Sequence, residues 1–448
     1  MSEVSTEPVR VAVVGCGGRG TVYSSWILEH PGTAIVTAVA DPRASARDRL
    51  GDRAAVAAEH RYADWRDLLA GDADGRVADA VLICTQDRQH AEPAIAFADA
   101  GWHILLEKPM APSEQECRDI HAAVIRAGVV FAVAHVLRYA AYTRAVKQVI
   151  DSGELGTLVN IEHLEPVGYW HFAHSYVRGN WRRTEESSPV LMAKSSHDID
   201  LLQHWAGARY SSVTSMGGLT WFKAANAPDG AGERCESCPV EPDCEYSALQ
   251  IYGSRLGRWP TTVVVEQQTE EALAAALHTG PYGRCVYRCD NDVNDHQSVI
   301  ATFDNGVTAS FTMTAFTEKL ERYTRVMGSH GTLSGDGNTF TVLDFRTGTE
   351  RTVDPAGELP GGVGGGHSGG DGGLIEGFIA AVASGDPDTI LSGPDASLDA
   401  HLAIFAAERA RTNGTIEPVH SVDPRHGAEP RHGVDPVEAG RRSVSMTP

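Results

Sequence analysis

A glycine-rich turn near the start of the chain has the spacing of a dinucleotide-binding motif. The segment "RVAVVGCGGRGTVYSSWILEH" (10–30) joins an apolar run to a helical pattern and contains Gly15, Gly17 and Gly20. In such a turn the first glycine permits the tight bend, the second lets a pyrophosphate approach the backbone, and the third packs helix against strand. The amides at the start of the helix then favour the negative charge of the pyrophosphate. Glycine-rich turns are common, so this motif needs support from its surroundings.

That support comes from an acidic residue at the end of the next apolar run. Asp41 closes the run "AIVTAVAD" (34–41), at the distance from the glycines that dinucleotide-binding folds use. A carboxylate there accepts a hydrogen bond from a ribose 2′-hydroxyl and repels a 2′-phosphate, which favours NAD over NADP. Arg43 is close enough to weaken that preference. We therefore predict that the turn binds NAD, with NADP as the alternative.

Four or five of the eight cysteines lie close together in one stretch of the sequence. "CESCPVEPDC" (235–244) has the pattern C-x-x-C-x5-C, formed by Cys235, Cys238 and Cys244, and Cys285 and Cys289 follow some forty residues later. Three clustered thiols and one later thiol match a tetrahedral structural zinc site. We favour Cys285 over Cys289 as the fourth ligand. An iron–sulfur cluster and free thiols remain open, whereas a redox C-x-x-C lacks its usual setting.

A third chemically rich segment is "YWHFAHSYVRGNWRR" (169–183), which gathers aromatic rings, histidines and arginines. Aromatic rings stack on sugar faces, and Arg and His bind hydroxyls or carboxylates, so this segment fits polyol recognition through His171, Arg178 and Trp181. A loop that covers the sheet or forms an oligomer interface would have the same composition.

The elements that must position these residues follow two rhythms. Up to about residue 135, nearly continuous apolar runs alternate with helical patterns, which is typical of a doubly wound parallel sheet. The apolar runs are 9–15, 34–41, 78–85, 103–109 and 129–135. The later part contains alternating runs with the turn signals "DNG" (304–306) and "SHG" (329–331), which predict an α+β domain with a large, mostly antiparallel open sheet.

We therefore expect an α/β Rossmann domain at 1–135 and a substrate-binding α+β domain at 136–415 that carries a cysteine-rich insertion at about 225–290. The polar tail at 416–448 is expected to be disordered. The loop "GGVGGGHSGGDGG" (361–373) either brings His367 and Asp371 over the site or is a plain linker.

Composition bounds the function classes. The net charge of −21 argues against binding to nucleic acid or to an anionic membrane, because both reward a positive surface. The polar N-terminus does not resemble a signal peptide, and no apolar stretch is long enough to span a bilayer. We expect a cytoplasmic protein.

Six motifs in order resemble the Gfo/Idh/MocA oxidoreductase family, and the resemblance extends from residue 9 to about 412. The motifs are "VVGCGGRG" (13–20), "AVADPR" (38–43), "ICTQDRQHAE" (83–92), "LLEKPM" (105–110), "AHVLRY" (134–139) and "SHDIDLLQHWAG" (196–207). The resemblance implies an N-terminal Rossmann domain and a C-terminal domain whose open sheet carries the substrate site and supports homo-oligomers, dimers or tetramers.

The resemblance also implies the reactive residues. Lys108, in E-K-P, matches the family lysine beside the nicotinamide, and a lysine at the end of a strand can polarise a carbonyl or help a hydroxyl lose its proton. The peptide bond before Pro109 is often cis in the family. His197 matches the family histidine that acts as acid or base. Asp200 shares its helix face and could orient the imidazole.

Two positions depart from the family pattern. Inositol-dehydrogenase-like members place an Asp four residues before the histidine, where this chain has Ala193, so that Lys194 is left to make the polar contact. Gln86 replaces the usual proline in "TQDRQH" (85–90), although Thr85 and His90 still match. These departures weaken an inositol assignment without changing the redox chemistry.

The sequence thus predicts an NAD-dependent oxidoreductase that acts on a hydroxyl or keto carbon of a sugar, sugar derivative or cyclitol. A glycoside-cleaving enzyme that uses NAD transiently is the alternative, followed by a non-catalytic nucleotide sensor. The predicted cofactor-binding residues are Gly15, Gly17, Gly18, Arg19, Gly20, Asp41, Arg43, Thr85, Gln86, His90, Glu107 and Lys108. The predicted substrate-binding residues are Arg138, Tyr139, His171, Arg178, Trp181 and Lys194.

Overall fold

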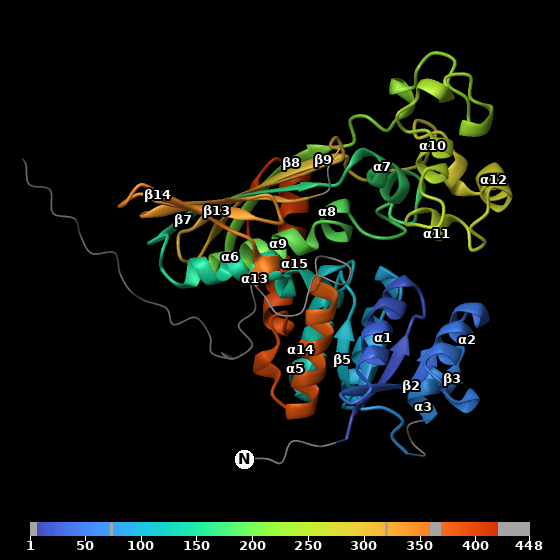
Figure 1. Ribbon diagram of the computed structural model, residues 1–448, viewed down its shortest axis with the longest axis horizontal. Coiled ribbons are helices and arrows are strands. Elements are labelled where there is room, and N and C mark those ends of the chain that lie inside the picture. Colours follow the sequence, from blue (N-terminus) through green and yellow to red (C-terminus); the bar gives the residue numbers. More distant parts are fainter. Residues whose placement is uncertain (1–6, 72–74, 319–320, 359–368, 420–448) are drawn as a thin grey trace, which may run out of the picture.

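Two β-sheets, joined by helices, form the protein (Figure 1). The computed structural model describes residues 7–71, 75–318, 321–358 and 369–419. Within those ranges no helix combines the length and the apolar character that crossing a membrane requires.

The first sheet is parallel throughout and has the order β3-β2-β1-β4-β5-β6. Its strands are β1 (Val9–Val14), β2 (Ala34–Ala40), β3 (Arg61–Tyr62), β4 (Ala80–Ile83), β5 (His103–Leu106) and β6 (Phe131–Val133). The helices between them are α1 (Gly18–Glu29), α2 (Ala44–Arg53), α3 (Trp65–Gly71), α4 (Ala91–Asp99) and α5 (Glu114–Ala127). This is the predicted Rossmann sheet, and only the two-residue β3 has no counterpart among the predicted strands.

The second sheet has nine strands in the order β14-β13-β12-β11-β7-β10-β9-β8-β15. These are β7 (Leu158–Pro166), β8 (Tyr210–Gly218), β9 (His296–Phe303), β10 (Thr308–Thr314), β11 (Tyr323–Gly328), β12 (Gly331–Gly335), β13 (Phe340–Asp344), β14 (Thr349–Val353) and β15 (Ile416–Pro418). Only the β7–β10 pair in this described sheet is parallel. The prediction of a mostly antiparallel sheet is confirmed, and the "DNG" and "SHG" turns join β9 to β10 and β11 to β12.

One face of this sheet is covered by helices and the other is open. The covering helices include α6 (Ala141–Asp151), α8 (Val190–Ala193), α9 (Ser196–Ala206) and α15 (Pro394–Asn413) (Figure 1). Burial alternates along β9, where Val299 and Ala301 are buried whereas Ile300 between them is 58% exposed. Such alternation is what an antiparallel sheet with one solvated face requires.

The C-terminal helices return to the Rossmann sheet and tie the two sheets together. Helix α14 (Gly370–Ser384) packs against α1 and the short helix η4 (Val136–Tyr139), and α15 packs against both α5 and α9. Strand β15, at the start of the segment predicted as a tail, pairs with β8. Residues 420–448 lie outside the described residues, as does His367, for which the sequence left a position over the site and a plain linker equally open.

The cysteine-rich insertion forms a separate lobe at the end of the nine-stranded sheet (Figure 1). Between β8 and β9 it contains the short helices α10 (Ala248–Gly253), α11 (Thr261–Val264) and α12 (Glu270–Thr279). An isolated bridge between Arg234 and Arg284 joins two segments of the lobe itself. Buried side chains of the lobe, among them Ala248, Tyr252 and Val286, belong to the same hydrophobic core as the two sheets.

Buried histidines give the fold a pH dependence that can be measured. Burial lowers the pKa of His174 and His401 to about 3 and that of His204 to about 4, whereas an unfolded chain protonates its histidines near pH ~6.5. Between these values the unfolded chain binds more protons, so we expect the free energy of unfolding to fall as the pH is lowered from about 6.5 to about 4. Urea unfolding at several pH values checks this, and a midpoint that stays constant down to about pH 5 would contradict it.

Candidate active site

The glycine-rich turn between β1 and α1 has the open space that a pyrophosphate needs. Gly15 has φ +94°, and a Cβ there would lie 2.5 Å from the carbonyl oxygen of Cys84. A Cβ at Gly20 would lie 2.2 Å from the carbonyl oxygen of Gly15. In contrast, a Cβ at Gly17 would meet nothing nearer than the Arg43 guanidinium at 3.6 Å, and one at Gly18, where α1 begins, would meet no atom within 4 Å. The outer glycines thus shape the turn and the inner two leave its mouth open.

Asp41 stands at the end of β2 beside this turn. Its carboxylate accepts hydrogen bonds from the backbone amide of Cys16 at 2.8 Å and from the Arg43 guanidinium at 2.9 and 3.0 Å. Burial opposes ionisation of Asp41, but the bonds from Arg43 and Cys16 outweigh it and lower its pKa. An ionised carboxylate is therefore held beside the glycine-rich turn.

The Glu107–Met110 segment, which we call the 107–110 turn, follows β5 and meets both halves of the chain. Glu107 accepts hydrogen bonds from Arg19 Nε and from the Tyr23 hydroxyl, both at 2.6 Å. Arg19 also pairs with Asp371 on α14 at 2.5 Å. Burial would raise the pKa of Glu107, but the charges of Arg19 and Lys108 and the hydrogen bond from Tyr23 lower it. The predicted cofactor residues Arg19 and Glu107 thus form a buried ionic cluster beside the glycine-rich turn.

Lys108 points from this turn towards the second domain. Its Nζ donates to the carbonyl oxygen of Ala193, at the end of α8, at 2.7 Å. The Lys108–Pro109 peptide bond is cis, as the resemblance implies. Burial lowers the pKa of Lys108, and Lys194 adds to this effect whereas Glu107 and Asp87 oppose it. A lysine with a lowered pKa exchanges protons more readily near neutral pH.

The rest of the turn is fixed by two histidines. His90 Nδ1 contacts the carbonyl oxygen of Pro109 at 2.7 Å. His401 on α15 accepts the Met110 amide at 2.8 Å through Nε2, while its Nδ1 donates to the carbonyl oxygen of Ser397 at 2.7 Å. Nearby, the Thr85 hydroxyl bonds the carbonyl oxygen of Gln89, and Gln86 is exposed. His90 therefore supports the 107–110 turn, and its predicted contact with the cofactor stays a prediction, whereas His401 is a support that the motifs did not reveal.

His197 is buried in the first turn of α9, a few residues beyond the Lys108 contact at Ala193. Its ring packs edge-on against His135, with the ring centroids 6.0 Å apart. His135 is 1% exposed, and within the described residues neither of its ring nitrogens has a hydrogen-bond partner. Burial and the charges of Arg138 and Lys108 lower the pKa of His135 well below its usual value. Lys108, His135 and His197 therefore lie together at the junction of the two domains.

Asp200 has a different partner from the predicted one. Its carboxylate forms a two-point ion pair with Arg138, at 2.7 and 2.8 Å, and Arg138 also donates to the carbonyl oxygen of Leu391 at 2.6 Å. The neighbouring Tyr139 hydroxyl accepts from the Leu391 amide at 3.1 Å. Arg138 and Tyr139, predicted to bind substrate, are buried residues that anchor the returning C-terminal chain, and Asp200 neutralises Arg138.

Lys194 begins a chain of charges that runs across the covered face of the second sheet. Its Nζ lies 2.9 Å from Glu165, which pairs with Arg322 at 2.7 Å. Arg322 in turn pairs with Asp198 at 2.5 Å, and Asp198 contacts His163 at 3.0 Å. Burial opposes ionisation of Asp198, but the charge of Arg322 and the bond to His163 hold its pKa far below the usual value. This chain fixes Lys194 at the edge of the site.

The segment 169–183, predicted to recognise the substrate, has His171 near Lys108 and Arg178 in the wall of a cavity in the cysteine lobe. His171 is half-buried, its ring lies 4.7 Å from Trp259 of the insertion, and burial and the nearby charges of Lys194 and Lys108 lower its pKa. Trp181 packs near Tyr176, with ring centroids 6.3 Å apart. Arg178, at the other end of the segment, lies in the wall of a cavity in the cysteine lobe. His171 therefore lies close enough to Lys108 for the charge of Lys108 to affect its pKa, whereas Arg178 lines the cavity of the cysteine lobe.

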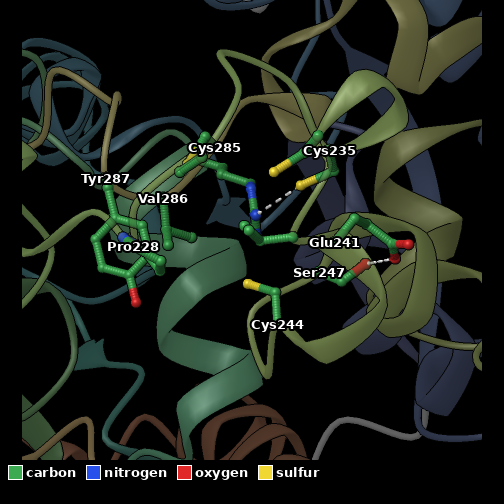
Figure 2. Close-up of a pocket in the computed structure, with 12 residues that line it drawn as sticks. Pro228, Cys235, Glu241, Cys244, Ser247, Cys285, Val286 and Tyr287 are labelled. Atoms are coloured by element: carbon green, nitrogen blue, oxygen red, sulfur yellow. Dashed lines mark hydrogen bonds between the residues drawn. The ribbon is translucent and has the colours of Figure 1, made fainter.

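That cavity collects the predicted metal ligands (Figure 2). Its lining includes Cys235, Cys238, Cys244 and Cys285, but not Cys289. All eight cysteines are free, and nowhere in the described ranges are three or more His, Cys, Asp or Glu side chains placed to hold a metal ion. The predicted residues thus converge on one cavity, although the zinc site itself is not formed in this structure.

Comparison with known proteins agrees with this architecture. The model of an oxidoreductase family with an NAD-binding Rossmann fold matches residues 9–135, and the model of the same family's C-terminal α/β domain matches residues 147–417. A levoglucosan dehydrogenase solved in complex with NADH superposes with a TM-score of 0.69 at 19% identity, covering 93% of this chain and 100% of that one. At that identity the superposition shows a shared fold.

Two curated relatives are similar over part of the chain. A 2,7-anhydro-N-acetylneuraminate hydratase of Escherichia coli (strain K12) is 26% identical over 273 residues, which span 59% of this chain and 67% of that enzyme. A 1,5-anhydro-D-fructose reductase of Ensifer adhaerens is 34% identical over 137 residues, which span 30% of this chain and 39% of that enzyme.

The glycine geometry predicts two different consequences of adding side chains. Gly17→Val should weaken NAD binding at least ~10-fold, because its side chain fills the open mouth of the turn, yet leave the thermal stability nearly unchanged. Gly20→Ala should instead lower the stability, because its Cβ would collide with the Gly15 carbonyl. Calorimetric titration and thermal unfolding of both variants check this, and normal NAD affinity in folded Gly17→Val would contradict it.

Proposed function

The chain belongs to the Gfo/Idh/MocA oxidoreductase family, and from that premise we propose that it transfers a hydride between NAD and a hydroxyl or keto carbon of a sugar, sugar derivative or cyclitol. The observation that carries the proposal is the position of Lys108. Its ammonium group lies where the carboxyl end of β5 meets the second domain, and its pKa is lowered by burial. Ligands of open α/β sheets bind at this end of the strands.

The residues around the glycine-rich turn fit NAD. Gly17 and Gly18 leave open space at the start of α1, where backbone amides favour a pyrophosphate, and Asp41 is the ionised carboxylate suited to a ribose. When bound, NAD supplies a nicotinamide that accepts or returns a hydride. The ion pair between Arg43 and Asp41 supports NAD over NADP, because it engages the arginine that a 2′-phosphate would need.

The protein's own part in the reaction is to position the substrate and move one proton. We propose that Lys108 Nζ takes the proton of the reacting hydroxyl during oxidation and returns it during reduction. His197 contacts the reacting oxygen from α9, and Lys194 and His171 bind neighbouring hydroxyls. The buried charges of Glu107 and Glu165 keep the two lysines in place. The proposed catalytic pair is therefore Lys108 and His197, and Asp200, which pairs with Arg138 and lies 3.8 Å from His135 Nε2, is a positioning residue.

The names of the relatives support a carbohydrate substrate. They include a dehydrogenase of levoglucosan and a reductase of 1,5-anhydro-D-fructose. These compounds, together with common aldoses and inositols, form the panel with which the protein should be tested. The cytoplasmic location and homo-oligomeric assembly expected from the sequence stay predictions.

A redox-neutral reaction is the second candidate function. The hydratase relative carries a name that implies no net transfer of electrons. In this candidate the same Lys108 would serve a transient oxidation, followed by elimination and re-reduction, and product would form from glycosides without any accumulation of NADH. An assay that follows sugar release and NADH together distinguishes the two.

The test of the proposal is Lys108→Met, measured with the substrate that the panel identifies. We expect kcat to fall by roughly 10²- to 10⁴-fold, the range for loss of a proton-transfer group, with NAD affinity nearly unchanged. Lys147→Met is the matched control, because Lys147 pairs with Asp151 on α6 and not with residues of the site. A folded Lys108→Met enzyme that keeps kcat within about tenfold would overturn the proposed role.

Replacing Asp41 tests the cofactor preference. In Asp41→Ala the Arg43 guanidinium loses its carboxylate partner and becomes available to a 2′-phosphate. We expect NAD to bind roughly tenfold more weakly and the ratio of NADP to NAD affinity to rise. Calorimetric titration with both nucleotides measures this, and an unchanged ratio would show that Asp41 does not contact the ribose.

A further inference from the structure

We propose that Cys235, Cys238, Cys244 and Cys285 bind one structural Zn²⁺ ion, and that the guanidinium of Arg178 is the buried counter-charge of this site. The inference is independent of the proposed redox reaction. It concerns the lobe that lies between β8 and β9 in the sequence. The chemistry proposed for Lys108 does not require a metal ion in this lobe.

The cavity has the size and the lining of a site for one ion. The four cysteines line one cavity of roughly 20 Å³, in which Figure 2 shows Cys235, Cys244 and Cys285 around a common space. A space of this size holds one small particle, since a water needs about 10–15 Å³ by the same measure. Four cysteine ligands and one ion are the composition of a closed structural zinc site.

Backbone contacts place Cys285, and not Cys289, beside the other three cysteines. Arg234 and Arg284 form an antiparallel bridge, and the Cys285 amide donates to the carbonyl oxygen of Glu233 at 3.0 Å. The bridge sets Cys285 beside Cys235. Cys289 instead directs its Sγ to the carbonyl oxygen of Cys285 at 3.3 Å and does not line the cavity. The backbone therefore selects Cys285.

Backbone amides donate hydrogen bonds to two of the four sulfur atoms. The Gly232 amide donates to Cys238 Sγ at 3.3 Å, and the Ala248 amide donates to Cys235 Sγ at 3.4 Å. Hydrogen bonds to ligand atoms orient them and tune a metal site. Two of the four sulfurs thus already have the partners that zinc-bound thiolates use.

The Arg178 residue carries a positive charge inside the lobe and is only 1% exposed. Its side chain donates to the carbonyl oxygens of Arg284 at 2.7 Å and Tyr246 at 2.8 Å, and to Cys235 Sγ at 3.6 Å. In the described part of the chain no carboxylate pairs with it. A guanidinium stays charged in proteins, and a buried charge needs a compensating partner. Zn²⁺ with four thiolates carries two negative charges, of which Arg178 offsets one.

The ion would also contribute folding energy to the lobe, as bound structural metals do. In this structure the sulfurs stand around the cavity and are not drawn onto one point, so the proposal requires them to turn inward on binding. Arg178 is the last residue of the helical segment η5 (Ala173–Arg178). The helix that directly precedes it, α7 (Tyr169–Phe172), contains His171. The ion would thereby fix the lobe to the segment that borders the site.

The test is elemental analysis and native mass spectrometry of the full chain purified without added metal. We expect about one zinc per chain. Cys285→Ser should lose the zinc, and the matched variant Cys289→Ser should keep it. Arg178→Met should keep the four ligands but lose zinc to a chelator at least ~10-fold faster, as for other residues that support metal ligands. Arg182→Met, on an exposed ion pair with Asp290, is its control.

Three results would overturn the proposal. They are a folded wild-type protein without metal in which Cys235, Cys238, Cys244 and Cys285 all react with thiol reagents, iron in place of zinc, or zinc lost from Cys289→Ser and kept by Cys285→Ser. If Cys285→Ser does not fold, release of zinc from the wild-type chain by a mercurial thiol reagent decides the question, because mapping by mass spectrometry should show these four cysteines modified as the ion leaves. Because the readout is metal content, it is separate from any failure of the redox proposal.

Discussion

The 107–110 turn is the constraint on which the rest of the structure depends. Glu107 is held by Arg19 from the glycine-rich turn, and Arg19 is held in turn by Asp371 from α14. The Met110 amide is bound by His401 from α15, so segments near both ends of the described chain converge on four residues. These bonds lie in a buried setting, where charged hydrogen bonds are strong and an unpaired partner is costly. The position of Lys108 is therefore set by the whole fold.

This arrangement explains why the charged residues of the site occur in buried pairs. Lys194 has Glu165, Arg138 has Asp200, and Arg322 has both Glu165 and Asp198. Removing one member of such a pair leaves an uncompensated buried charge. Lys108 differs from these residues, because its side chain bonds a backbone carbonyl and its pKa is lowered. That difference makes it the residue suited to proton transfer.

The features that the sequence predicted correctly are local ones. The glycine spacing and the apolar runs of the Rossmann sheet each lie within a few residues, and the structure forms the turn and the strands from them. The four cysteines line one cavity, and their metal ion stays a prediction. The partners of Asp200 and Arg178 could not be predicted, because each partner lies far from its residue in the sequence and is brought close only by the fold. Asp200 meets Arg138 from another element, and Arg178 enters the cysteine lobe. His401 was missed because an isolated histidine has no pattern that marks it, whereas His135 lies within the AHVLRY motif (134–139), where only Arg138 and Tyr139 were singled out.

We propose that the glycine-rich turn and Lys108 contact the same bound nucleotide. A crystal structure of the protein with NAD would test this. We expect the pyrophosphate to lie against the amides at Gly17 and Gly18, the ribose to contact Asp41, and the nicotinamide to lie beside Lys108 Nζ. A nucleotide bound elsewhere, or a nicotinamide turned away from Lys108, would contradict it.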